Sequence, residues 1–380
     1  MKAALLGHGT IGVGVDRIAK EIPEIEIVRV LALETDEEII GRHTFSVEDI
    51  LNDPEIDTVI EVMGGIHPAF EFISRAMEAG KNVVTANKAV VAAYYRELVS
   101  CSLKHQVSFR CTAAVGGGIP WLVNLSRAKQ GDRIAKIGGI MNGTTNFILS
   151  KMDREGSDFS SVLSEAQALG YAEKDPSADI DGDDVRRKLA ISASVAYDCF
   201  VDETRIPTAG IRFVRPQDLE FARSHKAVLK LCAFSERTSG GLSAYTAPFM
   251  IPECHILASV PENLNFLSLT ADHAGELGFY GQGAGRYPTA KNVVLDLLDI
   301  VSGIRTFYTE KTSDAAIDNS IPLCHWYFRS VCSDRIPDQQ ISGRTGDTAV
   351  TEILSVSDAF ALYKNLRKDD PEAFFAGILA

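Results

Sequence analysis

The sequence predicts an α/β protein, and three features along the chain support this. A short apolar run at residues 3–7 leads into the glycine-rich segment GHGTIG at 7–12, and a helix-like pattern follows. Apolar runs and amphipathic segments then alternate up to about residue 130, which is typical of strands and helices in a parallel sheet. Beyond that point the strand-like segments come in pairs separated by turn residues. We therefore predict an N-terminal Rossmann-type doubly wound sheet, followed by an α+β catalytic and dimerisation domain.

Composition excludes several classes of protein. The chain has 380 residues and a net charge of −13, with no compensating basic run, so it is not expected to bind nucleic acid or an anionic membrane. No apolar run approaches the ~18 residues of a membrane span. The seven cysteines are scattered and never spaced as CxxC, and the histidines form no close pair. We expect reduced thiols, no zinc site and a cytoplasmic location.

The segment GHGTIG has the form of a dinucleotide-binding loop. Gly7 permits a tight turn, Gly9 lets a pyrophosphate approach the backbone, and Gly12 lets the helix pack closely on the strand. Free N–H groups at the helix N-terminus then favour phosphate. Glu34 ends the second predicted strand (25–34), where a carboxylate accepts from a ribose 2′-hydroxyl and repels a 2′-phosphate. This favours NAD over NADP; the alternative is that Glu34 only begins a solvated loop.

The pattern continues with strands at 57–63, 81–86 and 107–114. Helices are predicted at 67–80 and 87–104, and a segment with three successive glycines lies at 115–120. Lys88 falls in the first turn of a helix capped by Asn87. A cation there is electrostatically unfavourable, which suggests a functional use; the alternative is a side chain that simply reaches solvent.

In the second domain, 131–287, Thr144, Thr145 and Asn146 form a polar cluster beside a turn. A helix is predicted at 158–170. Antiparallel pairs are predicted at 226–236 with 242–251, and at 265–272 with 275–282. These elements predict a mixed or antiparallel sheet flanked by helices, with one face available for contacts in a homodimer. A helix at 288–305 is expected to return to the first domain (1–130). The tail 306–380 contains a strand at 325–334 and an amphipathic helix at 355–368.

The stretch from Gly170 to Lys188, GYAEKDPSADIDGDDVRRK, carries six acidic residues and runs into a helix. Asp184 and Lys188 are four residues apart and therefore share one helix face. Taken alone, the stretch is compatible with a solvated loop and a surface ion pair. Next to the polar cluster at 144–146, Lys88 and two glycine-rich loops, it is instead interpreted as part of a substrate site.

Five motifs together resemble the homoserine dehydrogenase family. They are GHGTIG at 7–12, the segment 64–89 that ends in TANKA, NGTTNFIL at 142–149, the acidic stretch 170–188, and GQGAGRYPTA at 281–290. The resemblance implies NAD(P)-linked interconversion of L-homoserine and L-aspartate 4-semialdehyde, in the biosynthesis of threonine and methionine. A lysine can exchange the hydroxyl proton as hydride is transferred.

The same resemblance assigns the site residues. Lys188 is the proton donor and acceptor, with Lys88 and Asp184 also catalytic, and substrate is bound by Glu173, Asp179, Asp184 and Lys88. The cofactor is expected at Gly7, Gly9, Thr10, Ile11, Gly12, Glu34, Lys88, Gly170, Gly283 and Gly285.

The chain departs from the family in three places. Thr112 stands where the family usually has a glutamate that helps to hold a monovalent cation, so only the backbone of Val115, Gly117 and Ile119 remains to bind sodium. Glu34 stands where members often carry a basic residue. The tail resembles only the start of an ACT regulatory module, which puts feedback by threonine in doubt.

Two alternatives remain open on the sequence alone. One is a related oxidoreductase acting on another amino acid or aldehyde. The other is a non-catalytic NAD(P)-sensing protein, against which the charged residues Lys88, Glu173, Asp184 and Lys188 argue, because buried charges have little structural use.

Overall fold

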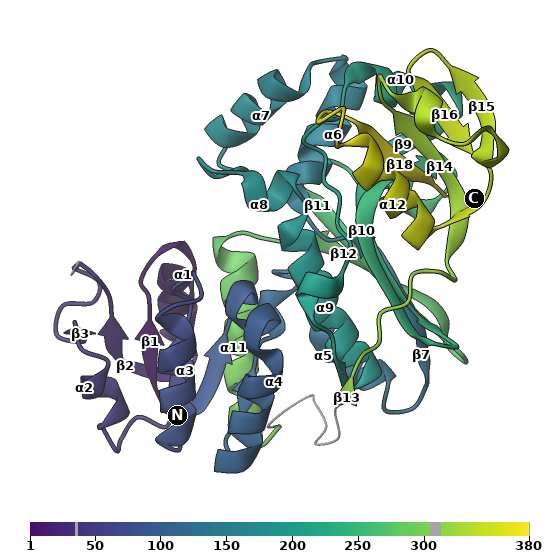
Figure 1. Ribbon diagram of the computed structural model, residues 1–380. Helices are drawn as coiled ribbons and strands as arrows, with labels where there is room; N and C mark the ends of the chain where they lie inside the picture. Colours follow the sequence, from purple (N-terminus) through teal and green to yellow (C-terminus); the bar gives the residue numbers. More distant parts are fainter. Residues whose placement is uncertain (35–36, 305–312, 380) are drawn as a thin grey trace. The chain divides into compact units, whose positions relative to one another are not determined.

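The computed structural model describes residues 1–34, 37–304 and 313–379 (Figure 1). The chain divides into two compact units. Unit 1 comprises Met1–Arg133, Ile191–Asp202 and Gly281–Asp314, and unit 2 comprises Ile134–Ala190, Glu203–Tyr280 and Ala315–Ala380. Each unit combines three segments that are far apart in the sequence, whereas the predicted domains were nearly continuous stretches of chain.

Unit 1 is built on a parallel six-stranded sheet with the order β3-β2-β1-β4-β5-β6. This order, which reverses at β1, is that of a doubly wound dinucleotide-binding sheet, so the predicted fold class is confirmed. The strands are β1 (Lys2–Leu6), β2 (Glu26–Leu31), β3 (His43–Thr44), β4 (Thr58–Glu61), β5 (Asn82–Thr85) and β6 (Phe109–Arg110).

Helices cover both faces of this sheet. The α-helices of unit 1 are α1 (Thr10–Ala19), α2 (Glu48–Leu51), α3 (Ala69–Glu78), α4 (Lys88–His105), α5 (Trp121–Ala128) and α11 (Arg286–Val301), of which α1, α3, α4 and α11 contact strands of the sheet. Val15 of α1 and Val293 of α11 share one buried cluster with Ala3 and Leu5 of β1. Because alternate strand residues face opposite sides, the remaining buried residues of β1 face away from this cluster. α3 contacts β4 and β5, and it also contacts α4.

The strand predicted at 107–114 is much shorter in the structure. β6 ends at Arg110 and a 3₁₀ turn, η1 (Thr112–Ala114), follows. The backbone N–H of Thr112 donates to the carboxylate of Asp296 on α11 at 2.8 Å, and its hydroxyl donates to the same carboxylate at 2.7 Å. A side chain far away in the sequence therefore takes the hydrogen bond that a continuing strand would need.

Residues 191–202 belong to unit 1, although the sequence placed them in the second domain. They contain the end of α9 (Asp183–Tyr197) and β8 (Cys199–Phe200), which pairs with β13 (Ser313–Asp314). Trp121 on α5 donates its indole N–H to the hydroxyl of Ser192 at 2.9 Å, and Lys129 donates to the carbonyl of Val195 at 2.9 Å. These bonds attach the end of α9 to α5.

Unit 2 is built on a mixed sheet of ten strands. Nine follow the order β12-β11-β7-β9-β10-β18-β14-β16-β15, and β17 (Leu354–Ser355) pairs with β14. Their bounds are β7 (Ile134–Ile140), β9 (Ala227–Thr238), β10 (Gly241–Pro252), β11 (Leu264–Ala271), β12 (Gly275–Gln282), β14 (Leu323–Arg329), β15 (Ile341–Thr345), β16 (Thr348–Thr351) and β18 (Phe374–Ile378). β10 and β18 run parallel. The α-helices are α6 (Gly143–Glu155), α7 (Phe159–Ala168), α8 (Ser177–Ile180), the start of α9, α10 (Pro216–Ser224) and α12 (Val356–Leu366).

The described part of the tail, from residue 315 on, is an integral part of unit 2. β18 lies in the sheet between β10 and β14, and α12 packs beside β14 (Figure 1). Trp326 and Phe328 of β14 and Phe375 of β18 share one buried cluster with Phe249 of β10. The tail is therefore packed into the hydrophobic core rather than attached as a separate segment.

A buried ion pair also joins the tail to α10. Asp218, fully buried on α10, accepts hydrogen bonds from Arg329 Nε at 2.9 Å and from the hydroxyl of Tyr327 at 2.8 Å. Its other oxygen accepts from the backbone N–H of Arg215 at 2.8 Å. The carboxylate is thus held by both β14 and the start of α10.

Replacing Arg329 by methionine should lower the free energy of unfolding by about 3–5 kcal/mol, because it leaves Asp218 as an uncompensated buried charge. Chemical denaturation would measure this loss. The matched control is Arg335→Met, which breaks the exposed pair with Asp369 and should cost no more than about 1 kcal/mol. Equal losses for the two variants would show that the Arg329 pair is not part of what fixes the tail.

Candidate functional site

The glycine loop after β1 has the geometry of a phosphate-binding turn. Gly7 has φ +98°, and a Cβ on Gly12 would lie 2.1 Å from the carbonyl oxygen of Gly7, so α1 packs directly against the turn. A Cβ on Gly9 would meet nothing within 4 Å. α1 begins at Thr10 and Ile11, with no side-chain cap and no acid in its first turn. Its N-terminal N–H groups therefore suit a pyrophosphate, and these residues fit the cofactor that the sequence implies.

Glu34 follows β2 at the carboxyl edge of the same sheet. The strand ends at Leu31, and the Glu34 side chain is exposed. Residues 35 and 36 of the predicted acidic loop lie outside the described residues. This edge is where ligands bind in doubly wound sheets, so Glu34 is available to a bound ribose.

A buried glutamate that the sequence analysis did not identify holds the loops after β4 and β5. Glu61, fully buried at the end of β4, accepts hydrogen bonds from Thr85 Oγ1 at 2.6 Å, Asn87 Nδ2 at 3.3 Å and the backbone N–H of Met63 at 2.8 Å. Burial raises its pKa. In the sequence, Glu61 could have been recognised as an acidic residue that ends an apolar strand. Asn87 caps α4 through the N–H of Val90, so this network fixes the position of Lys88, the half-buried first residue of α4.

The two later glycine-rich segments of unit 1 lie against each other. A Cβ on Gly117 would lie 2.5 Å from the backbone carbonyl of Gly283, and the N–H of Gly118 donates to the carbonyl of Gln282 at 3.0 Å. The three successive glycines at 116–118 therefore allow a close approach to the loop that precedes α11. Gly285, with φ +119°, is the residue before that helix.

Three of the predicted residues in unit 2 come together around one asparagine. Lys188 Nζ lies 2.8 Å from Asp184 Oδ2 and donates to the carbonyl of Met141 at 2.7 Å. Asn142 Nδ2 donates to Asp184 Oδ2 at 2.8 Å and to Asp179 Oδ1 at 2.7 Å. Asp184 and Lys188 are only 1% and 6% exposed, so the pair is buried and is not the surface pair that the sequence left open.

Asn142 was not identified as a site residue from the sequence, although it begins the NGTTNFIL motif. It follows β7 and caps α6, where its Oδ1 accepts from the N–H of Thr145 at 2.8 Å. Thr144 donates its hydroxyl to the carbonyl of Tyr171 at 2.6 Å. The polar cluster predicted beside a turn is thus the first turn of a helix, and it ties down the start of the acidic stretch.

Other residues of that stretch lie apart from the buried pair. Glu173 is exposed, and in the described chain no hydrogen bond joins its carboxylate to Asp184 or Lys188. Gly170 follows α7 with φ +76°. Asp181 forms a bidentate pair with Arg212 at 2.6 and 2.7 Å, and Asp183 pairs with Arg186 at 2.8 Å. Asp184 is thus buried and Asp179 half-buried beside Asn142, whereas Glu173 is exposed and Asp181 and Asp183 pair with arginines.

Comparisons with known proteins identify the family. Residues 7–111 match the profile "Homoserine dehydrogenase, NAD binding domain", and residues 120–298 match the profile "Homoserine dehydrogenase". A homoserine dehydrogenase of Synechocystis sp. is 39% identical over 87% of this chain and 79% of its own length. One of Lactococcus lactis is 36% identical over 86% and 82%.

The chain belongs to the homoserine dehydrogenase family. A crystal structure of a homoserine dehydrogenase from Thiobacillus denitrificans superposes with a TM-score of 0.88 at 31% identity, covering 100% of this chain and 98% of that one. Members of the family are NAD(P)-dependent oxidoreductases, as the five sequence motifs implied.

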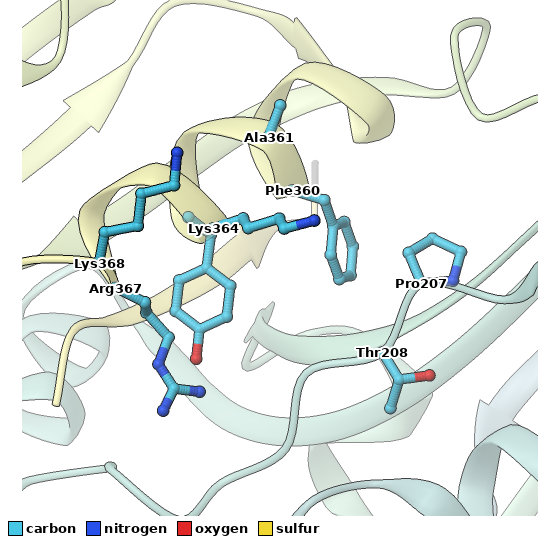
Figure 2. Close-up of a pocket in the computed structure, with 8 residues that line it drawn as sticks. Pro207, Thr208, Phe360, Ala361, Lys364, Arg367 and Lys368 are labelled. Carbon is cyan, nitrogen blue, oxygen red and sulfur yellow. The ribbon is translucent and has the colours of Figure 1, made fainter. Parts of the chain in front are cut away.

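An open cavity of unit 2 is lined by residues outside these homoserine dehydrogenase motifs. Its volume is about 630 Å³, and it is lined by Pro207, Thr208, Phe360, Ala361, Tyr363, Lys364, Arg367 and Lys368. Figure 2 shows the amino group of Lys364 beside the Phe360 ring, whereas Lys368 and Arg367 leave α12 in different directions. The three cations do not converge on one point. All three lie at the C-terminal end of α12, where positive charge interacts favourably with the helix dipole, so their charge does not by itself indicate a ligand.

The described helices include none with both the length and the apolar character that crossing a bilayer requires. All seven cysteines are free thiols, as the sequence predicted.

Proposed function

We propose that this chain interconverts L-homoserine and L-aspartate 4-semialdehyde, with Lys188 exchanging the proton of the substrate oxygen. The observation that carries the proposal is the buried pair of Lys188 and Asp184, with the amine held between a carboxylate and the carbonyl of Met141. An amine fixed in this way is positioned for proton transfer, and Lys188 is only 6% exposed.

Lys188, Asp184 and Asn142 each have a distinct role in the proposed reaction. A nicotinamide cofactor, which the glycine loop at 7–12 would hold, would supply the hydride acceptor or donor for C4 of the substrate. In oxidation, neutral Lys188 takes the hydroxyl proton as the C4–O double bond forms, and in reduction the ammonium returns it. Asp184 stabilises the protonated amine and fixes its direction, since it is itself held by Asn142.

Residues of both charge signs suit the amino-acid substrate, whose α-carbon carries an ammonium and a carboxylate. Its ammonium group calls for carboxylates, and we assign Asp179, with Glu173 from the exposed part of the stretch, to that role. Lys88, whose position is fixed by the Asn87 cap, is assigned to the cofactor and the substrate carboxylate.

The assay that tests the function measures initial rates with L-homoserine and NAD or NADP, with or without added threonine. Turnover with homoserine that exceeds turnover with other hydroxy amino acids is expected. Tight binding of NAD without turnover would instead support the NAD(P)-sensing alternative, and a better rate with another substrate would support a related oxidoreductase.

We also propose a preference for NAD. The exposed carboxylate of Glu34 repels a 2′-phosphate, so kcat/KM should be higher with NAD than with NADP, by about 10-fold for one unit charge near the surface. Glu34→Gln removes the charge with little change in shape and should reduce that ratio. A wild-type preference for NADP would contradict the assignment of Glu34.

A homodimer is proposed for the assembly, in the cytoplasm. β12, at one edge of the unit 2 sheet, exposes Leu277 and Tyr280, which are 40% and 56% accessible. An edge strand with apolar side chains suits pairing with a second copy. A solution mass equal to that of a single chain would contradict this proposal.

A further inference from the structure

Two of the three backbone groups expected to bind sodium already accept hydrogen bonds. Asn292, on α11, donates through Nδ2 to the carbonyl of Gly117 at 2.5 Å and to that of Ile119 at 3.2 Å. A side-chain amide has two N–H donors, so both are used on this one loop. The amide nitrogen thus bridges the same two oxygens that a cation would have to bridge.

The burial of Asn292 leaves one chemically workable orientation for the amide. The residue is fully buried, and its Oδ1 has no hydrogen-bond partner among the described residues. The reverse orientation would bring Oδ1 against two carbonyl oxygens and leave both N–H donors unpaired, which costs more than one unpaired acceptor. The N–H groups therefore point at the loop, and a cation cannot approach donors of that kind.

Position 112 offers no charge to a cation either. Thr112, which stands where the family usually has glutamate, directs both its hydroxyl and its backbone N–H to the carboxylate of Asp296. That carboxylate also accepts from Arg110 Nε at 2.9 Å, and its oxygens are therefore engaged. Hard cations bind through oxygen atoms that carry negative charge, and here Thr112 supplies none while the carboxylate of Asp296 accepts hydrogen bonds from Thr112 and Arg110.

We propose that the Asn292 amide takes the place of the monovalent cation that the family resemblance implies, so that this chain needs neither sodium nor potassium. The loop at 115–120 is the one whose Gly117 and Gly118 contact the backbone of Gln282 and Gly283. A neutral amide fixes that loop without the desolvation cost of a buried ion. The proposal concerns unit 1 alone and does not depend on which substrate the protein takes.

Thermal unfolding in matched salts tests the proposal without using activity. The full-length protein is compared in sodium, potassium and choline chloride at equal ionic strength, and ²³Na relaxation is followed as protein is added. We expect the same Tm in all three salts and no relaxation change beyond that of a cation-independent control protein. A Tm that rises saturably with sodium or potassium, relative to choline, would overturn the proposal.

The isosteric variant Asn292→Asp tests whether the amide stands at a cation position. It replaces two donors with an anion that faces two carbonyls, so its Tm should fall in choline by at least about 2 °C and be partly restored by sodium or potassium. The control is Asn319→Asp in unit 2, a buried asparagine that donates to the carbonyl of Ala244 at 3.0 Å. The fall in Tm of this control variant should be the same in all three salts. An equal loss for Asn292→Asp in the three salts would overturn the assignment, and if that variant does not fold, the wild-type salt series still decides.

Discussion

Replacement of Lys188 by alanine should lower kcat for homoserine oxidation by about three orders of magnitude, the usual contribution of a positioned acid–base group. Binding of NAD should persist, because the nucleotide loop belongs to unit 1 and Lys188 to unit 2. Steady-state rates and fluorescence titration with the nucleotide would measure the two effects separately. Near-normal turnover in a folded variant would exclude Lys188 as the proton-transfer group.

The stability of this variant must be measured, because Asp184 is 1% exposed and loses its ion-pair partner. An unpaired buried carboxylate costs about 3–5 kcal/mol, enough to unfold a marginal protein. Lys188→Arg keeps the positive charge, yet a guanidinium does not deprotonate near neutral pH, so this variant should fold better and remain inactive. Lys174→Ala, an exposed lysine of the same stretch, is the control and should retain activity.

Local patterns were sufficient to predict the parallel sheet and the spacing of the buried pair. The order of strand, glycine turn and helix is encoded within a few residues of Gly7, and the alternation of strands and helices predicted a parallel sheet, although it did not predict the order of its strands. The four-residue interval between Asp184 and Lys188 predicted a shared helix face, and the two side chains do meet. Such features depend on neighbours in sequence.

Burial and long-range partners could not be predicted in the same way. Met141 and Asn142, which hold Lys188 and Asp184, lie 47 and 42 residues before them in the chain. β18 pairs with β10 across more than a hundred residues, so no local pattern shows that the tail completes the unit 2 sheet. Asn292 reaches back 175 residues to Gly117, and only the folded chain shows that this amide meets the predicted cation ligands.

Replacement of Asn142 by aspartate should lower kcat/KM for homoserine by at least about 10- to 100-fold, since it removes two charge-assisted hydrogen bonds, of which one alone is worth about 1.5–3 kcal/mol. The new carboxylate can still cap α6 through the N–H of Thr145, so the helix start is kept. What is lost is the Nδ2 donor that links Asp179 and Asp184, and three carboxylates then face one another. One of them should become protonated near neutral pH.

Exchanging the donor at 142 with the acceptor at 179 separates a positioning role of Asn142 from a general loss of folding. In the double variant Asn142→Asp with Asp179→Asn, an amide at 179 can donate to the carboxylate at 142, which removes one negative charge and restores one hydrogen bond. We expect kcat to recover in part, because only the carboxylate at 142 then faces Asp184, whereas KM should stay high because the substrate ammonium has lost the carboxylate of Asp179. Rates and Tm should be measured for both single variants and the double variant. A double variant with the product of the two single losses would mean that Asn142 does not act through Asp179, and its effect on Lys188 would then have to run through Asp184 alone.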